Sequence, residues 1–168
     1  MDNCKRKRRG ESLELLNLTQ EELLKAKNVV MRIVQWQGYP DEMVLLSKEL
    51  TELPKSSILY RLTPVADESG VLRVDGRIGA APFASFDSRY PVILPRNHPV
   101  TKLVVDDFHR AFRHGNSETV VNEIRQFYNI SRMRTVVKQI AAACQWCKVK
   151  KAKPKLPNVY PAVHLHRN

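Results

Sequence analysis

Apolar positions in the first part of the chain recur with a helical period. Between Thr19 and Gly38, hydrophobic residues return every three or four positions, which is the spacing of one face of a helix. Thr19 and Glu22 have the separation of a capping box, in which the two residues cap the first turn of a helix together. Gly38 ends this helix, and a second, shorter helix is predicted from Asp41 to about Leu50.

The middle of the chain has the pattern of short strands. Residues 58–62 and 71–74 are rich in aliphatic side chains, and the turn-forming sequence 67–70 separates them, which predicts a β-hairpin. A third short strand is predicted at 90–95. Prolines bound it, and we therefore expect it at an edge of a sheet. Residues 80–89 are predicted to be loop.

The last third of the chain returns to helical spacing. A helix is predicted to begin near Asn97 and to end at His114, where Gly115 and the residue after it allow the chain to turn. Two further helices are expected at 118–128 and 132–144. Three short helices with a tight break between the second and third have the outline of a helix-turn-helix.

Composition restricts the class of protein. The chain has 168 residues, of which 43% are hydrophobic, and this is ordinary for a soluble globular protein. Its apolar runs are far shorter than the roughly 20 residues that span a bilayer. No apolar segment follows the charges at the N-terminus, so we expect an intracellular protein, nuclear or cytoplasmic and not secreted, that does not bind a membrane.

The positive charge is concentrated toward the C-terminus. The formal net charge is +11, and residues 96–168 contain 14 Lys and Arg against 4 Asp and Glu, whereas residues 11–95 contain 9 against 12. Such an asymmetry is typical of nucleic-acid-binding proteins, although it also suits a merely soluble basic surface. The basic run from Lys5 to Arg9 predicts a disordered tail, which could act as a nuclear-import signal or as a phosphate-binding arm.

Four side chains in the basic part have the chemistry of a structural zinc site. The pattern is two histidines with four residues between them, then 29 residues, then a Cys-x-x-Cys pair, and the four are His109, His114, Cys144 and Cys147. Neutral imidazoles and thiolates satisfy Zn²⁺ in a closed tetrahedron, and two thiolates also neutralise its charge. The sequence therefore predicts one structural zinc ion, without which residues 97–150 should not fold.

Two other interpretations of these residues remain. The histidines could be ordinary helix residues, and the cysteines could be a redox dithiol. A redox pair usually sits at a helix N-terminus, which lowers the pKa of a thiol, whereas here the pair follows the predicted helix at 132–144, whose C-terminal dipole disfavours a thiolate. The third cysteine, Cys4, is remote from the pair, so that a disulfide framework is not expected.

Candidate nucleic-acid contacts lie on and after the last predicted helix. Its apolar residues point to one side, which leaves Arg and Lys side chains of the kind that reach phosphates and base edges on the other. A run of lysines after the cysteine pair is expected to form a flexible arm. The predicted contacts are Arg134, Lys138, Gln139, Lys148, Lys150, Lys151 and Lys153. A solvated helix face is the alternative for each.

The His/Cys spacing and the phrases around it resemble a known family. His-x₄-His-x₂₉-Cys-x₂-Cys is similar to the zinc domain at the N-terminus of retroviral and retrotransposon integrases. Three surrounding phrases, GVLRVDGRI from Gly70, YPVILP from Tyr90 and CQWCK from Cys144, resemble the integrase region of BEL/Pao long-terminal-repeat retrotransposons. The resemblance covers most of residues 54–156.

The resemblance carries expectations about function. In that family the zinc domain is a three-helix, helix-turn-helix bundle that helps integrase to multimerise and to engage DNA ends. It implies that His109, His114, Cys144 and Cys147 are the zinc ligands. It also implies DNA, or RNA, and a second copy of the chain as partners, and no small-molecule substrate.

Catalysis in the family belongs to a following RNase-H-like core, which holds Mg²⁺ with three carboxylates. Residues 148–168 contain no Asp or Glu, so this polypeptide by itself is not expected to be an enzyme or to transfer DNA strands. The alternatives are a zinc-organised module for protein interaction or multimerisation, and a truncated version of an active integrase.

The predicted fold class is α+β, mainly α. An N-terminal helical hairpin precedes a small β-hairpin with antiparallel strands, and a zinc-stabilised three-helix domain follows. The expected divisions are a basic tail at 1–18, a helical hairpin at 19–53, a hairpin and strand segment at 54–96, the zinc domain at 97–150 and a basic, proline-containing tail at 151–168.

Overall fold

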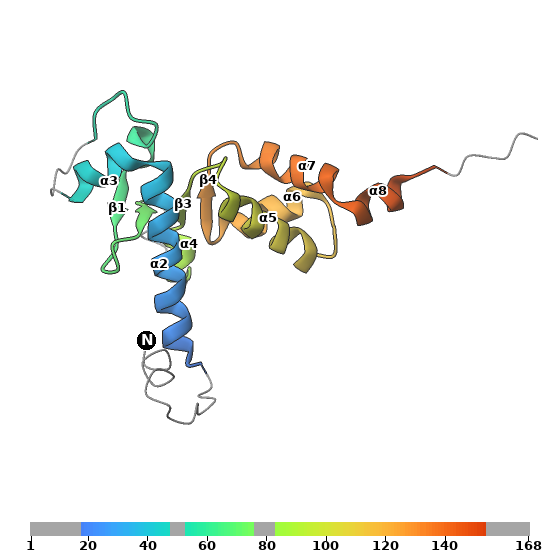
Figure 1. The fold of residues 1–168 in the computed structure, drawn as a ribbon, viewed down its shortest axis with the longest axis horizontal. Coiled ribbons are helices and arrows are strands. Elements are labelled where there is room, and N and C mark those ends of the chain that lie inside the picture. Colours follow the sequence, from blue (N-terminus) through green and yellow to red (C-terminus); the bar gives the residue numbers. More distant parts are fainter. Residues whose placement is uncertain (1–17, 48–52, 76–82, 154–168) are drawn as a thin grey trace, which may run out of the picture.

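The computed structural model describes residues 18–47, 53–75 and 83–153. Within these ranges the chain is mainly helical and contains one small four-stranded sheet (Figure 1), which confirms the α+β, mainly α, fold class. None of the helices in the described ranges is both long and apolar enough to cross a membrane. The predicted tails at 1–18 and 151–168 lie almost entirely outside the described residues.

Two helices open the described part of the chain, α2 (Gln20–Gly38) and α3 (Pro40–Ser47). The capping box that the sequence predicted is present, because the Thr19 hydroxyl accepts a hydrogen bond from the Glu22 N–H at 3.2 Å and the Glu22 carboxylate accepts one from the Thr19 N–H at 2.9 Å. The expected end of the second helix near residue 50 lies outside the described residues.

The predicted hairpin exists, but its first strand is displaced. Residues Tyr60–Leu62 form the 3₁₀ helix η1, and the strand β1 is Pro64–Ala66, paired antiparallel with β2 (Leu72–Val74). The expectation of a strand at 58–62 was therefore wrong. The turn decides the register, because the Asp67 carboxylate accepts backbone hydrogen bonds within it and closes the hairpin directly after β1.

The third strand, β3 (Val92–Leu94), lies in the interior of the sheet and not at its edge. The strand order is β1-β2-β3-β4, and all three residues of β3 are buried. The expected edge position was wrong because Pro91 and Pro95 flank the paired residues. A proline outside the ladder removes no ladder hydrogen bond.

A short helix, α4 (Phe86–Arg89), occupies part of the stretch 80–89 that was predicted to be loop. The Ser85 hydroxyl caps it by accepting a hydrogen bond from the Ser88 N–H at 3.3 Å. The expectation of loop was wrong for these four residues, which are too few to show a helical period. The beginning of the stretch, up to residue 82, lies outside the described residues.

The last third of the chain contains four helices. It also contains a strand, which the sequence did not predict. The helices are α5 (Pro99–Ala111), α6 (Ser117–Arg125), α7 (Met133–Ala143) and α8 (Gln145–Lys151). Between α6 and α7 lies β4 (Tyr128–Ile130). The predicted helix at 118–128 thus ends earlier than expected, at Arg125, and only its last residue, Tyr128, belongs to the strand.

The strand β4 joins the last third of the chain to the preceding part. It pairs in parallel with β3, with Val92 opposite Tyr128 and Leu94 opposite Ile130. A parallel pair needs a crossover connection, and α5 and α6 supply it. One sheet therefore extends across the division expected between residues 96 and 97. The connection between α6 and α7 is also longer than the three or four residues typical of a helix-turn-helix.

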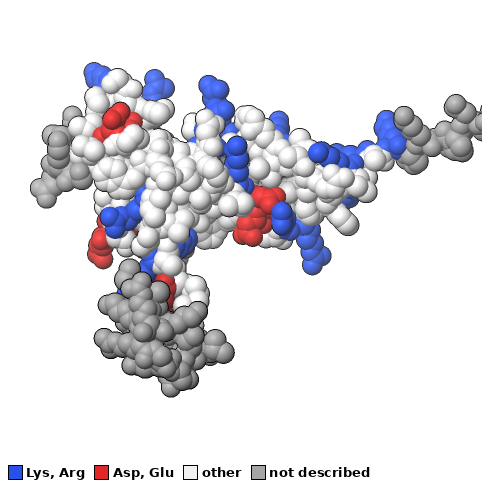
Figure 2. All heavy atoms as spheres, in the orientation of Figure 1, with Lys and Arg blue, Asp and Glu red and all other residues white. Residues whose placement is uncertain are grey.

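Charged side chains are unevenly distributed over this fold (Figure 2). On the face drawn, Lys and Arg side chains follow the edge of the molecule from α7 to the end of α8, and acidic side chains gather over α5. The Lys and Arg side chains described on α7 and α8 are all exposed. The elongated helical end of the molecule is therefore its basic end, as the sequence predicted.

The sheet separates two hydrophobic clusters. On β3, Val92 and Leu94 belong to the larger cluster, which includes residues of α2, α5, α6, β4 and α7, and Ile93 belongs to the smaller cluster with Tyr39 and Met43. Successive residues of a strand point to opposite faces. The three residues of β3 therefore anchor both clusters.

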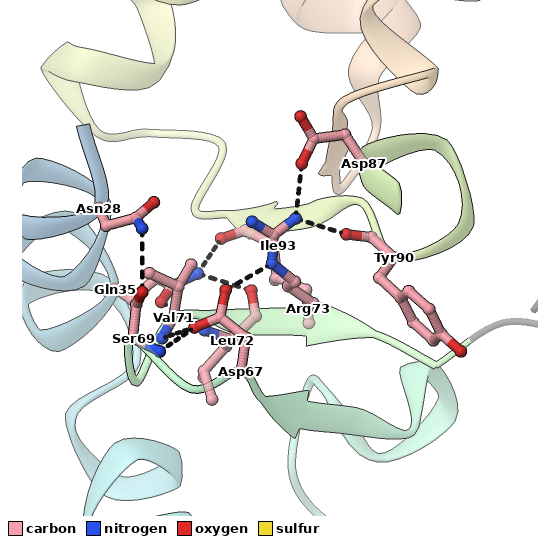
Figure 3. A network of polar contacts seen from close by, with 10 residues as sticks. All are labelled: Asn28, Gln35, Asp67, Ser69, Val71, Leu72, Arg73, Asp87, Tyr90 and Ile93. Carbon is pink, nitrogen blue, oxygen red and sulfur yellow. Dashed lines mark hydrogen bonds and ion pairs between the residues drawn. The ribbon is translucent and has the colours of Figure 1, made fainter. Parts of the chain in front are cut away.

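A buried glutamine joins α2 to the sheet (Figure 3). The Gln35 amide nitrogen donates to the carbonyl oxygens of Leu72 and Ile93, both at 2.8 Å, and its oxygen accepts from the Leu72 N–H at 2.8 Å. The side chain is fully buried. The strands β2 and β3 pair at Arg73 and Val92, and the Val74 N–H also donates to the Pro91 carbonyl at 3.0 Å. On the Leu72 side of this pair, the Gln35 amide provides hydrogen-bond partners for buried backbone groups of both strands.

A buried arginine holds the turn and α4 against β2 (Figure 3). The Arg73 guanidinium contacts the carboxylates of Asp67 at 2.6 Å and Asp87 at 2.9 Å, and it donates to the Tyr90 carbonyl at 2.8 Å. It also lies 4.9 Å from the centre of the Phe86 ring. These partners satisfy a charge that would otherwise be costly to bury.

We predict that Gln35→Leu lowers the free energy of unfolding by about 2–4 kcal/mol, because buried backbone groups of Leu72 and Ile93 lose their partners. Chemical denaturation followed by circular dichroism measures the change. The matched control is Gln139→Leu on the exposed side of α7, which should shift stability by less than about 0.5 kcal/mol. Equal losses in the two variants would show that the Gln35 bridge contributes nothing specific.

Candidate metal centre

The first candidate ligand, His109, lies in the last turn of α5 and is 1% exposed. The helix places His109 in the interior because Thr101 and Val105, at four-residue intervals before it, lie on the same side of α5 and are also buried. Burial lowers the pKa of His109, and the nearby His114 ring lowers it further. The neutral imidazole, which is the form that binds a metal, is therefore favoured.

A turn with left-handed backbone conformation brings the second candidate ligand, His114, close to His109. Arg113 and His114 have φ values of 51° and 56°, and the His114 N–H donates to the His109 carbonyl at 2.9 Å. The turn was expected at Gly115, but in the described residues the only glycine with a positive φ is Gly70. Two residues with side chains thus adopt a conformation that costs each roughly 1–2 kcal/mol.

The two cysteines lie at the junction of two helices. Cys144 ends α7 and begins α8, and Cys147 is buried in the first turn of α8. The expectation that the pair lies only at a helix C-terminus was wrong. The backbone N–H groups of Cys147 and Trp146 lower the pKa of the Cys144 thiol, whereas burial raises the pKa of Cys147. The dipole argument against a redox pair therefore fails.

The histidine ring nitrogens lie close to the sulfurs of both cysteines. His109 Nε2 lies 3.0 Å from His114 Nδ1 and 3.2 Å from the Cys147 sulfur, and His114 Nδ1 lies 3.4 Å from the Cys144 sulfur and 3.8 Å from that of Cys147. All four ligand atoms lie within 4.8 Å of one another. We call these four residues the His/Cys cluster.

These separations are those of a tetrahedral zinc site. With zinc bonds of about 2.0–2.1 Å to nitrogen and about 2.3 Å to sulfur, the edges of a tetrahedron are about 3.3 Å between nitrogens and about 3.5 Å between nitrogen and sulfur. The cluster has 3.0 Å between the nitrogens, and three of its four nitrogen–sulfur separations are 3.2, 3.4 and 3.8 Å. The donor set and its spacing fit one zinc ion, which these four residues could hold.

An aromatic ring that the sequence analysis overlooked lies beside the cluster. The Trp146 ring is 5.9 Å from the His114 ring, at an interplanar angle of 32°, and it is 61% exposed. Its position between the two cysteines was the signal that could have identified it. Trp146 therefore lies next to the cluster, and its ring is also open to solvent.

The predicted nucleic-acid contacts on α7 are exposed, but one of them already has an ion-pair partner. Arg134, Lys138 and Gln139 are exposed on α7 as predicted. The Arg134 guanidinium, however, pairs with the Glu118 carboxylate on α6 at 3.0 Å. Part of its charge is thus already neutralised, which the sequence could not show because the two residues belong to different helices.

The lysines after the cysteine pair begin as a helix and not as a flexible arm. Lys148, Lys150 and Lys151 belong to α8 and are exposed, and Lys153 follows the end of the helix. The expectation of a flexible arm was wrong as far as residue 151. Because Cys144 directly precedes α8 and Cys147 lies in its first turn, the His/Cys cluster sets the direction in which these lysines extend.

Comparison with known proteins agrees with this geometry. Residues 96–153 match a family model described as the integrase zinc binding domain, of the two-His, two-Cys type. Integrase domains of this type bind zinc, and the matched range contains all four residues of the His/Cys cluster. No curated protein and no solved structure matches the chain.

We predict one zinc ion per chain in the purified protein and its loss in Cys144→Ser, because a serine hydroxyl replaces a thiolate ligand. Elemental analysis measures the zinc, and circular dichroism should show that helix in residues 98–150 is lost both in the variant and after chelation. Cys4→Ser, the same exchange remote in sequence, is the control and should retain zinc. Unchanged zinc and helicity in Cys144→Ser would exclude this residue as a ligand.

We predict that Arg113→Gly raises the free energy of unfolding of the zinc-loaded protein by up to about 1 kcal/mol, because glycine adopts a positive φ without steric cost. Urea denaturation measures the change. Arg110→Gly is the matched control, since Arg110 lies inside α5, where glycine costs about 1 kcal/mol. Destabilisation of similar size in both variants would contradict the strained turn.

Proposed function

We propose that the chain is a zinc-organised, DNA-binding part of an integrase of the BEL/Pao retrotransposon type. In this proposal His109, His114, Cys144 and Cys147 are the ligands of one structural zinc ion. The observation that carries it is the convergence of their four ligand atoms within 4.8 Å, inside the range that matches the integrase zinc binding domain. The BEL/Pao assignment rests on the sequence phrases around Gly70, Tyr90 and Cys144.

The zinc would act on the fold and not on a substrate. Two nitrogens and two sulfurs fill a tetrahedron and leave no position for water, as in structural zinc sites. The ligands come from the end of α5, the turn after it and the junction of α7 and α8. Bound zinc would therefore fix the end of α5 against the start of α8, which carries the lysines.

The proposal assigns no strand transfer to these residues by themselves. Such chemistry needs carboxylates that hold divalent ions. In the described part of the chain, the His/Cys cluster is the only group of three or more His, Cys, Asp or Glu side chains placed to hold a metal ion. Purified chain that processed a DNA end in the presence of Mg²⁺ would contradict this part of the proposal.

DNA binding is supported by the charge and exposure of the helical end. Lys138 on α7 and Lys148, Lys150 and Lys151 on α8 are exposed and have no ion-pair partner among the described residues. The exposed Trp146 ring lies on the same short helix. Lysines bind backbone phosphates, and an exposed aromatic ring can stack on a base.

A module for protein interaction is the second candidate, and α2 favours it. The side of this helix that faces away from the sheet is apolar, with Val29, Val30, Ile33 and Trp36 each between 41% and 54% exposed. These residues recur every three or four positions, as in a helix that packs against a partner. Such a surface would account for multimerisation, and α2 lies outside the matched residues 96–153.

Salt dependence separates the two functions. We predict that the zinc-loaded chain binds a labelled DNA duplex and that affinity falls steeply between about 50 and 200 mM salt, by about 40-fold if three phosphates are contacted. Fluorescence anisotropy measures this. Lys148→Gln with Lys151→Gln should weaken binding and flatten the salt dependence, and Lys25→Gln on α2 is the control. Salt-insensitive self-association that Ile33→Glu abolishes, without DNA binding, would instead support the protein-interaction module.

A further inference from the structure

A hollow lined by arginines lies where the sheet meets α4 and α7. Its volume is about 600 Å³. The side chains that line it and could bind an anion are those of Arg89, Arg125, Arg132, Arg134, Ser88 and Thr135. No carboxylate is among its lining residues. We call this the arginine hollow, and it is distinct from the His/Cys cluster, with which it shares no residue.

Three of the four arginines form no ion pair among the described residues. Among the described residues, Arg134 pairs with Glu118, but no carboxylate pairs with Arg89, Arg125 or Arg132. Cations gathered around one hollow repel one another unless an anion lies between them. The guanidinium group presents several N–H donors in a planar fork that matches the oxygens of a phosphate.

Two groups at the hollow lack hydrogen-bond partners. The Arg89 Nε is buried and has no acceptor in the part of the chain that the structure describes. The helix α7 begins at the hollow, and no side chain caps its first turn, since its N-cap residue, Arg132, has a φ of 53° and makes no capping hydrogen bond. Free N–H groups at a helix start favour an anion.

We propose that the arginine hollow binds a phosphate group, which in the proposed function is a backbone phosphate of the bound nucleic acid. The four guanidinium groups supply the positive charge, and the start of α7 supplies backbone donors. The source of the phosphate rests on the proposed function, whereas the chemistry of the hollow does not. A free phosphorylated compound is the other source, and the test distinguishes the two.

The hollow combines two parts of the chain. Arg125, Arg132 and Arg134 lie within the residues that match the integrase zinc binding domain, whereas Ser88 and Arg89 precede them. The pairing of β3 with β4 brings these parts together, since Asn129 and Ile130 of β4 also line the hollow. A zinc domain without the preceding residues would therefore lack one wall of the site.

The test compares two variants of the full, zinc-loaded chain that lose the same charge. The first is Arg89→Gln with Arg125→Gln, and the control is Arg61→Gln with Lys102→Gln, two exposed residues outside the arginine hollow. Zinc content and helicity establish that each variant is folded. If the first variant does not fold, Arg125→Gln alone replaces it, because that side chain is exposed.

The probes are a short labelled DNA duplex, followed by fluorescence anisotropy, and millimolar inorganic phosphate, followed by the thermal midpoint. We expect the hollow variant to bind the duplex at least about tenfold more weakly than the control, with a salt slope smaller by about two. Phosphate should raise the midpoint of the wild-type chain and of the control, and should leave that of the hollow variant unchanged.

Each other outcome has a definite meaning. If the hollow variant binds the duplex as tightly as the control, the phosphate site is refuted and the proposed DNA binding stands. If no duplex binds but phosphate stabilises every chain except the hollow variant, the site holds for a free phosphorylated compound and the proposed function fails. If neither probe binds the wild-type chain, the site is refuted.

Discussion

The fold depends on a strand of three residues that is buried on both of its faces. Val92, Ile93 and Leu94 pair with β2 on one side and with β4 on the other, and their side chains enter both hydrophobic clusters. Each Å² of apolar surface removed from water contributes about 25 cal/mol, so the burial of these three side chains stabilises both clusters at once. The helices of the last third are therefore joined to the preceding part by backbone pairing as well as by packing.

The polar interactions around this strand follow from the same burial. Leu72 and Ile93 are buried, and leaving buried backbone groups without partners costs about 1–3 kcal/mol each. The Gln35 amide satisfies them and brings α2 onto the sheet. Because the side of α2 that carries Gln35 faces the sheet, the opposite, apolar side of α2 is exposed.

The metal centre and the arginine hollow lie at opposite ends of α7. The His/Cys cluster joins the C-terminal end of α5 to the junction of α7 and α8, whereas the hollow lies at the N-terminal end of α7. Zinc would fix one end of α7 and a phosphate would lie at the other. If both proposals hold, nucleic acid could contact the molecule along α7, from the hollow to the lysines of α8.

Features that depend on residue type and short spacing could be predicted from the sequence. It predicted the capping box at Thr19, the start of α5, and the four residues of the His/Cys cluster, because caps, helical periods and zinc ligands have fixed local chemistry. It also located the positive charge at the end of the chain. None of these features requires knowledge of what lies opposite in the fold.

How these segments meet became known from the three-dimensional structure. It showed that β4 is a strand, that β3 is central, that Gln35 hydrogen-bonds to both β2 and β3, and that Arg89 and Arg132 line one hollow. Strands of three residues carry too few positions for a period to be recognised. Their pairing depends on contacts between residues far apart in the chain, and a single sequence does not specify such contacts locally.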